Sequence, residues 1–211
     1  METTRKINCI CSKCGEKEEI ELPQIITEEN RRETEDLSLF KWKCPKCGHI
    51  LKLLYPCMYV NEKKKILIWY INDLKDTEQL ERELPERFQQ STILFMKRFC
   101  HTLEEFGEKV RVLEGGLEDR TIELLKIMTF ARMHISDETI ESIYFYRRNE
   151  MNNCEFTIFT REGPSGITLP FSMYEEINEL VEREMPVLQD RFYCIDLDWA
   201  GEQIMQRKSE E

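Results

Sequence analysis

Four of the nine cysteines form two short pairs whose spacing is typical of metal ligands. Cys11 and Cys14 stand in the segment Cys-Ser-Lys-Cys-Gly, and Cys44 and Cys47 stand in Cys-Pro-Lys-Cys-Gly. Two residues between the cysteines let one tight turn present both thiolates to the same ion, and four thiolates complete the tetrahedral coordination of zinc. Because such a set leaves no position for water or substrate, the sequence predicts one structural Zn²⁺ per chain.

A glycine after each pair supports this interpretation. In a metal-binding turn of this kind, a zinc knuckle, backbone amides hydrogen-bond the first thiolate, and the residue after the second cysteine takes a positive φ that suits glycine. Gly15 and Gly48 stand at that place. The intervening residues 15–43 are long enough to leave one knuckle, form a strand and a loop, and return. We therefore expect an antiparallel zinc ribbon over residues 1–72.

A third thiol stands close to the first pair. Cys9 precedes Cys11 by two residues, which places both sulfurs on one side of a strand. There Cys9 is placed to replace a ligand, or to form a disulfide with Cys11 or Cys14 after oxidation, so a zinc-thiolate redox sensor is an alternative. The simpler interpretation is a partly buried spare thiol. Single cysteines within apolar stretches are expected in the core, and these are Cys57, Cys100, Cys154 and Cys194.

Lysines are frequent between residues 41 and 65, around and after the second cysteine pair. The cluster is interleaved with aromatic residues, and its members are Lys41, Trp42, Lys43, Lys46, Lys52, Tyr59, Lys63, Lys64 and Lys65. Lysines that converge with exposed rings would bind single-stranded nucleic acid. A net charge of −11 opposes that alternative, since residues 73–211 contain 17 Lys+Arg against 30 Asp+Glu. Otherwise the lysines form a solvated strand face that discourages edge pairing.

No catalytic constellation accompanies the predicted metal site. His101 follows Cys100, but neighbours on a helix point about 100° apart and make a poor base and nucleophile. His49 follows a set of ligands that is already complete. Asp196 and Asp198 lack a partner histidine, and Asp198 is predicted as a helix N-cap. We therefore expect a non-enzymatic interaction or regulatory module whose partner is another protein.

Composition indicates a cytoplasmic protein without a membrane segment. Every apolar run is interrupted by charge before the ~18 residues needed to cross a bilayer, and residues 1–6 lack the apolar segment of a signal peptide. An odd number of cysteines with two short pairs favours metal over disulfides. A reducing compartment fits both observations.

The rest of the chain is predicted to fold as an α+β unit. A polar connection over residues 73–91 precedes residues 92–211, which hold a helical pair, a small antiparallel sheet and flanking helices. The predicted elements are helices over residues 99–113 and 119–134, strands over 140–147, 154–161 and 167–170, and helices after 172 and over 198–206. Ser172 and Glu175 are expected to form a capping box, and residues 192–195 a last strand.

Parts of the sequence resemble the CpXC domain family of bacterial and archaeal proteins. The resemblance is carried by residues 40–49 around the second cysteine pair, by Tyr55-Pro56, and by residues 68–70, 113–120, 123–126 and 198–200. It implies that Cys11, Cys14, Cys44 and Cys47 are the family's four cysteines. Ser12 stands where the family pattern has proline, which loosens that turn without removing a ligand. The resemblance implies a prokaryotic zinc ribbon and carries no activity with it.

Overall fold

The computed structural model describes residues 4–71, 82, 95–133 and 140–210; for residues 131–133 and 208–210 it describes the backbone alone. Its contacts divide the chain into two compact units, Met1–Val110 with Asp190–Tyr193, and Arg111–Gln189 with Cys194–Glu211. Both units mix helices and strands, which confirms the predicted α+β class. No helix within the described residues is long and apolar enough to cross a membrane.

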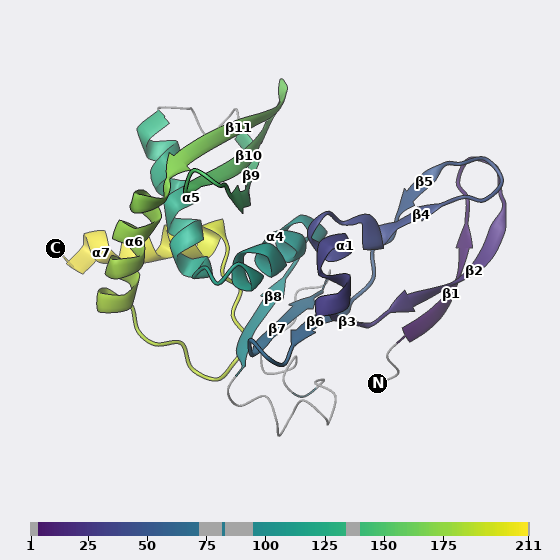
Figure 1. Cartoon of the computed structure of the whole chain (residues 1–211), viewed down its shortest axis with the longest axis horizontal. Coiled ribbons are helices and arrows are strands. Elements are labelled where there is room, and N and C mark those ends of the chain that lie inside the picture. Colours follow the sequence, from purple (N-terminus) through teal and green to yellow (C-terminus); the bar gives the residue numbers. More distant parts are fainter. Residues whose placement is uncertain (1–3, 72–81, 83–94, 134–139, 211) are drawn as a thin grey trace. The chain divides into compact units, whose positions relative to one another are not determined.

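The first unit is rich in short strands (Figure 1). Its strands are β1 (Thr4–Ile10), β2 (Lys17–Pro23), β3 (Ile25–Thr27), β4 (Lys41–Lys43), β5 (Ile50–Lys52), β6 (Cys57–Asn61), β7 (Ile66–Tyr70) and β8 (Met96–Cys100). Its helical segments are two single turns, Glu28–Asn30 and Ser38–Phe40, the short helix α1 (Arg31–Glu35), and the beginning of α4 (Leu103–Glu114). The loop expected between the two cysteine pairs thus contains α1.

A mixed sheet in the order β3-β6-β7-β8 forms the centre of this unit. β6 and β7 make an antiparallel hairpin, while β3 runs parallel to β6 and β8 runs parallel to β7. Every residue of β6 and β7 is buried, and Asn61 at the end of β6 is their one strongly polar member. The rings of Phe40 and Tyr70 both pack against Phe106 of α4, so this helix covers one face of the sheet.

The observed division differs from the predicted domain boundary. The predicted connection 73–91 lies, except for Arg82, outside the described residues. On either side of it, Ile66 of β7 and Met96 of β8 are partners in a parallel ladder. Residues on both sides of that connection therefore build one sheet, and the contacts divide the chain after Val110 instead.

Helix α4 begins later than its apolar spacing predicts. Phe99 belongs to β8, and the helix starts at Leu103 behind a capping box. In that box the Glu105 amide donates to Thr102 Oγ1 at 3.1 Å, and the Thr102 amide donates to Glu105 Oε2 at 3.2 Å. Parallel pairing with β7 satisfies the backbone of residues 96–100, which therefore do not need a helix.

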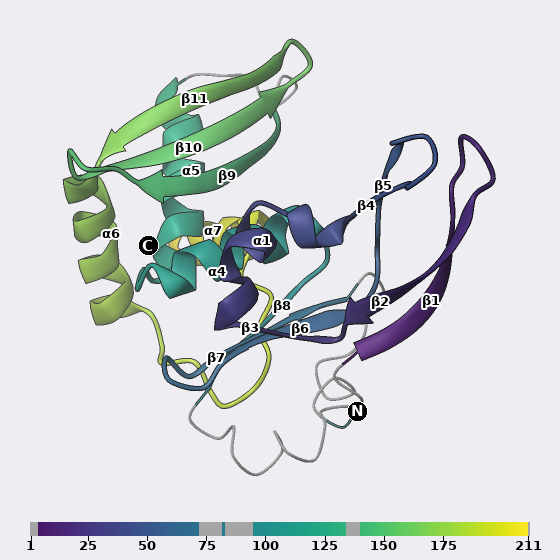
Figure 2. The same ribbon diagram turned by 45° about the vertical axis from the view of Figure 1, so that its right-hand side comes forward.

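The second unit packs three helices with one antiparallel sheet (Figure 2). Its elements are α5 (Asp119–Met133), β9 (Ile140–Arg148), β10 (Asn153–Thr160), β11 (Gly163–Pro170), α6 (Phe171–Glu184) and α7 (Leu197–Glu210), with strand order β11-β10-β9. Helix α5 contacts both α6 and α7. Ile143 and Phe145 of β9 are buried with Phe156 and Ile158 of β10, so one face of the sheet contributes to the core.

Three local predictions for the C-terminal part of the chain are wrong. Helix α6 has Pro170 as its N-cap, without a side-chain cap, so Ser172 does not form the expected capping box. Asp196, not Asp198, caps α7, because its Oδ1 accepts from the Trp199 amide at 2.8 Å. In place of a strand over residues 192–195, the structure has one isolated bridge between Tyr193 and Arg98.

Candidate metal centre

The two cysteine pairs occupy the turns of two short hairpins. β1 and β2 pair antiparallel over seven residues each and enclose the first turn, while β4 and β5 pair over three residues and enclose the second. The turns share one hydrogen-bond pattern. The Cys11 amide donates to the Glu16 carbonyl at 2.8 Å and the Gly15 amide to the Cys11 carbonyl at 2.9 Å. Equivalent bonds run from Cys44 to His49 at 2.8 Å and from Gly48 to Cys44 at 2.9 Å.

Both glycines take the conformation that their position predicts. Gly15 and Gly48 each have φ of +72°. Side chains with a Cβ adopt this region at a cost of about 1–2 kcal/mol. The backbone of each knuckle thus depends on the glycine after its second cysteine.

The four sulfurs gather in one place, as the adjoining turns in Figure 1 indicate. Cys11 Sγ lies 3.6 Å from Cys47 Sγ, and Cys14 Sγ lies 3.6 Å from Cys44 Sγ. All four sulfurs lie within 4.8 Å of one another. A tetrahedral ion with metal–sulfur bonds of about 2.3 Å places its sulfurs about 3.8 Å apart. The cluster therefore has the size of a tetrathiolate metal site.

The electrostatics of the cluster also fit a cation. Burial opposes ionisation of Cys11, but the backbone amides of Cys14 and Lys13 outweigh it, and its pKa falls to about 7. The Glu16 amide favours the thiolate of Cys14, but burial and the thiols of the other three cysteines raise its pKa to about 12. The thiol of Cys11 therefore ionises readily, whereas the neighbouring thiol of Cys14 resists ionisation. A divalent cation at their centre would remove that conflict.

A small apolar core supports the cluster. Cys9, Cys11, Trp42 and Cys44 are buried together, and Leu51 packs against them. Trp42 Nε1 donates to Glu18 Oε2 at 2.7 Å, which joins the β4–β5 hairpin to the β1–β2 hairpin. Cys9 therefore lies on the same side of its strand as Cys11, as expected. Burial, followed by the neighbouring Cys11, raises the pKa of the Cys9 thiol.

The predicted lysine cluster is divided between two places. Lys41, Lys43, Lys46 and Lys52 belong to the β4–β5 hairpin and its turn, whereas Lys63, Lys64 and Lys65 lie in the turn after β6. Lys46 pairs with Glu16 at 3.3 Å, and Lys63 pairs with Glu28 at 2.5 Å. Tyr59 is completely buried and Trp42 is 7% exposed. The exposed ring that the nucleic-acid alternative requires is therefore not found at either position.

The remaining candidates take structural positions. The His49 side chain is half-buried and its carbonyl completes the second knuckle, while the His101 ring packs edge-on against Phe99 with centroids 5.2 Å apart. Cys57, Cys100 and Cys154 are buried, as predicted for core residues. Cys194 is half-buried, and its thiol donates to Asp196 Oδ2 at 3.1 Å.

Sequence reasoning missed the residues that close each knuckle. Glu16 and His49 each stand five positions after the first cysteine of their pair and accept its amide. An alignment of the two pairs on each other would have identified both. Glu18 was also missed, because its bond to Trp42 joins residues 24 positions apart.

The hairpins and their sulfur cluster define a class of protein, namely an α+β protein with a four-cysteine site able to hold a metal ion. A family model described as CpXC protein matches residues 9–126, more than half of the 211 residues. The chain therefore belongs to the CpXC family, and the matched segment includes all four cysteines. No curated protein and no solved structure matches the chain.

Proposed function

We propose that the cysteine cluster binds one structural zinc ion and that β1, β2, β4 and β5 form a zinc ribbon. The observation that carries this proposal is the sulfur geometry, with paired distances of 3.6 Å across the two knuckles. Tetrahedral sites of four sulfurs take zinc or iron. The small core beneath the site offers little burial of its own, so binding free energy of about 10–16 kcal/mol would supply much of the folding free energy.

Native mass spectrometry of the purified chain tests the metal. The expected result is one zinc ion per chain, and the same spectrum reports the number of subunits. Cys44→Ser or Cys47→Ser should lower the zinc content, whereas Cys194→Ser, a matched substitution outside the cluster, should not. Visible absorption of an iron tetrathiolate, or full zinc content in both ligand variants, would contradict the proposal.

The function that this site supports best is a non-enzymatic protein-interaction or regulatory module. A closed set of four thiolates leaves no coordination position for a substrate, so the metal would hold a surface in shape. Thiolates also need a reducing compartment, which supports a cytoplasmic location. Affinity capture from the source cytoplasm should return a reproducible protein partner, and Cys44→Ser should lose it. Capture without a reproducible partner would count against this function.

A zinc-thiolate redox sensor is a second candidate because Cys9 is buried in the same small core as Cys11 and Cys44. In that function hydrogen peroxide would oxidise two thiolates, that of Cys9 and that of Cys11 or Cys14, to a disulfide. The peroxide would take two electrons from the thiolates and two protons from solvent to become two water molecules, and the zinc ion, having lost a ligand, would be released. The raised pKa of Cys9 slows such chemistry, since the thiolate is the reactive form. Cys9→Ser separates the candidates, because a sensor would lose reversible oxidation while a scaffold would keep both its zinc and its partner.

A further inference from the structure

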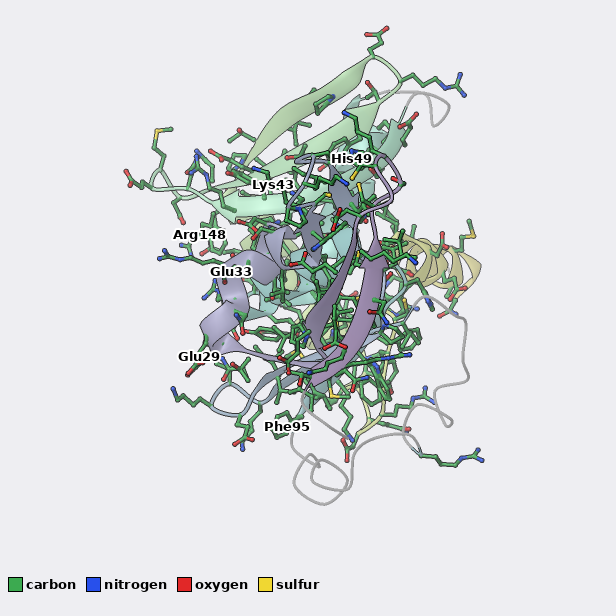
Figure 3. All side chains as sticks on the ribbon, turned by 90° about the vertical axis from the view of Figure 1, so that its right-hand side faces the viewer. Glu29, Glu33, Lys43, His49, Phe95 and Arg148 are labelled. Atoms are coloured by element: carbon green, nitrogen blue, oxygen red, sulfur yellow. The ribbon has the colours of Figure 1, made fainter. Side chains whose placement is uncertain are left out.

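One face of the β4–β5 hairpin carries positive charge without compensation within the hairpin. Side chains alternate along a strand, and Trp42 and Leu51 point into the small core beside the cysteines. Their neighbours therefore share the opposite face, and we call Lys41, Lys43, Ile50 and Lys52 the lysine face. Lys41, Lys43 and Lys52 are exposed, and Ile50 is 57% exposed. Figure 3 labels Lys43 near the turn of this hairpin.

The pairing register makes this arrangement unfavourable for the isolated hairpin. Lys41 stands directly opposite Lys52, and Lys43 stands opposite Ile50. Like charges at directly opposed positions destabilise a strand pair. Lys52 reaches Glu104 of α4 at 2.6 Å, but no described carboxylate pairs with Lys41 or Lys43. Two ammonium groups therefore remain available beside an exposed apolar side chain.

The β1–β2 hairpin provides an internal comparison. It has the same kind of knuckle and, among the described residues, is likewise a sheet of only two strands, yet its outer face carries charges of both signs. Lys6 pairs with Glu19 at 3.3 Å, and Thr4 donates to Glu21 at 2.5 Å. Charged side chains can therefore protect strand edges without an excess of positive charge on one face, because the β1–β2 hairpin carries charges of both signs.

We propose that the lysine face binds an acidic segment of a partner protein. Carboxylates of that segment would pair with Lys41 and Lys43, and an apolar side chain would cover Ile50. This inference rests on the proposed function, since the hairpin is expected to need its metal. A peptide suits the face better than a nucleic acid because the candidate stacking rings, Trp42 and Tyr59, are both buried and offer no surface to a base.

Fluorescence anisotropy with the full zinc-loaded chain tests the proposal. The probe is a fluorescein-labelled decapeptide of glutamate with two central leucines, titrated at low ionic strength, where exposed charge pairs are least screened. The expected result is saturable binding that the double variant Lys41→Glu, Lys43→Glu weakens roughly tenfold. The charge-matched control Lys6→Glu, Lys17→Glu lies on the sister hairpin and should change binding much less.

A second pair of variants tests the apolar contact. Ile50→Ser should weaken binding, whereas Ile10→Ser should not, although Ile10 is similarly exposed at 54%. Equal losses in the two variants would overturn the proposal, as would failure of the zinc-loaded wild-type chain to bind the peptide. Tighter binding of poly-uridine that depends on Lys41 and Lys43 would replace the peptide by a nucleic acid.

Zinc content, measured on every sample, distinguishes failure of this inference from failure of the proposed function. A zinc-loaded chain that ignores the peptide would overturn the inference alone. A wild-type chain that takes up no zinc would overturn both.

Discussion

Gly15 and Gly48 connect backbone conformation to metal binding at the scale of single residues. Gly48→Ala should keep all four thiolates but strain the second knuckle, whose φ is +72°. The left-handed conformation costs alanine about 1–2 kcal/mol, so the zinc affinity should fall roughly tenfold. Competition with a chromophoric zinc chelator measures this change.

Asparagine provides the control, because it tolerates the left-handed region better than alanine does. Gly48→Asn should therefore recover part of the affinity that Gly48→Ala loses. Unchanged affinity in Gly48→Ala would mean that the knuckle does not need this conformation to hold its ligands.

Tyr55 carries a buried hydroxyl whose oxygen has no hydrogen-bond partner among the described residues. Its ring packs beside Phe40 with centroids 5.5 Å apart, and burial raises the pKa of its hydroxyl. Removing an unsatisfied buried polar group relieves its desolvation cost. Tyr55→Phe should therefore raise the free energy of unfolding by up to about 1 kcal/mol, as measured by urea denaturation.

Tyr174→Phe should change the free energy of unfolding in the opposite direction. Tyr174 Oη accepts from the Glu118 amide at 2.8 Å and donates to Asn178 Oδ1 at 3.4 Å. Its loss should lower the free energy of unfolding by about 1 kcal/mol. Destabilisation of similar size in both variants would show that Tyr55 has a partner in solution.

The spacing of the cysteines was sufficient to predict the four candidate ligands. The place of Gly15 and Gly48 directly after each cysteine pair was sufficient to predict their positive φ. Spacing could not predict the exposure of aromatic residues. Tyr59 is buried in β6, a central strand between β7 and β3, and β3 starts 34 positions earlier at Ile25. Burial of the ring depends on packing between segments that are distant in the sequence, and a local pattern does not contain that packing.

At the scale of elements, α1 and α4 approach each other closely at Gly107. A Cβ built there would lie 2.9 Å from Leu37 Cδ2, 3.0 Å from the Thr34 carbonyl oxygen and 3.3 Å from the Glu35 carbonyl oxygen. Leu37 could move, but the two carbonyls belong to the backbone. Gly107→Ala should therefore destabilise the first unit by about 1–3 kcal/mol in urea denaturation, despite the better helix propensity of alanine.

Gly201→Ala is the matched control in a helix. Gly201 lies in α7, and a Cβ there would meet nothing within 4 Å. That variant should be neutral or more stable by about 0.5–1 kcal/mol. A stabilising effect of Gly107→Ala would mean that α1 withdraws from α4 at little cost.

Elements made by local contacts were predicted better than elements made by distant ones. Helix α5 and the β9–β10 hairpin lie close to the predicted ranges, because a continuous apolar helix and an alternating hairpin are local patterns. The last two residues of strand β8, Phe99 and Cys100, fall within the predicted helix, since Phe99 and Leu103 have helical spacing. The capping box of Thr102 and Glu105 marked the true start of α4 and could have been recognised in the sequence.

At the scale of the whole molecule, the contacts separate the hairpins from a second unit with its own core. The second core is formed by residues of β9, β10 and α6 such as Phe145, Phe156 and Val181, and it contains none of the four metal-ligand candidates. The two units should therefore respond differently to loss of metal.

Removal of zinc by a chelator should unfold the two hairpins and leave the second unit folded, because metal binding would stabilise only the unit that holds the ligands. Hydrogen exchange followed by mass spectrometry measures this difference. Amides of β1, β2, β4 and β5 should lose protection, while those of β9 and β10 keep it. Zinc added back in excess of the chelator should restore the hairpins and serves as the control. Loss of protection in β9 and β10 on the same timescale would show that the chain folds as one cooperative unit around its metal.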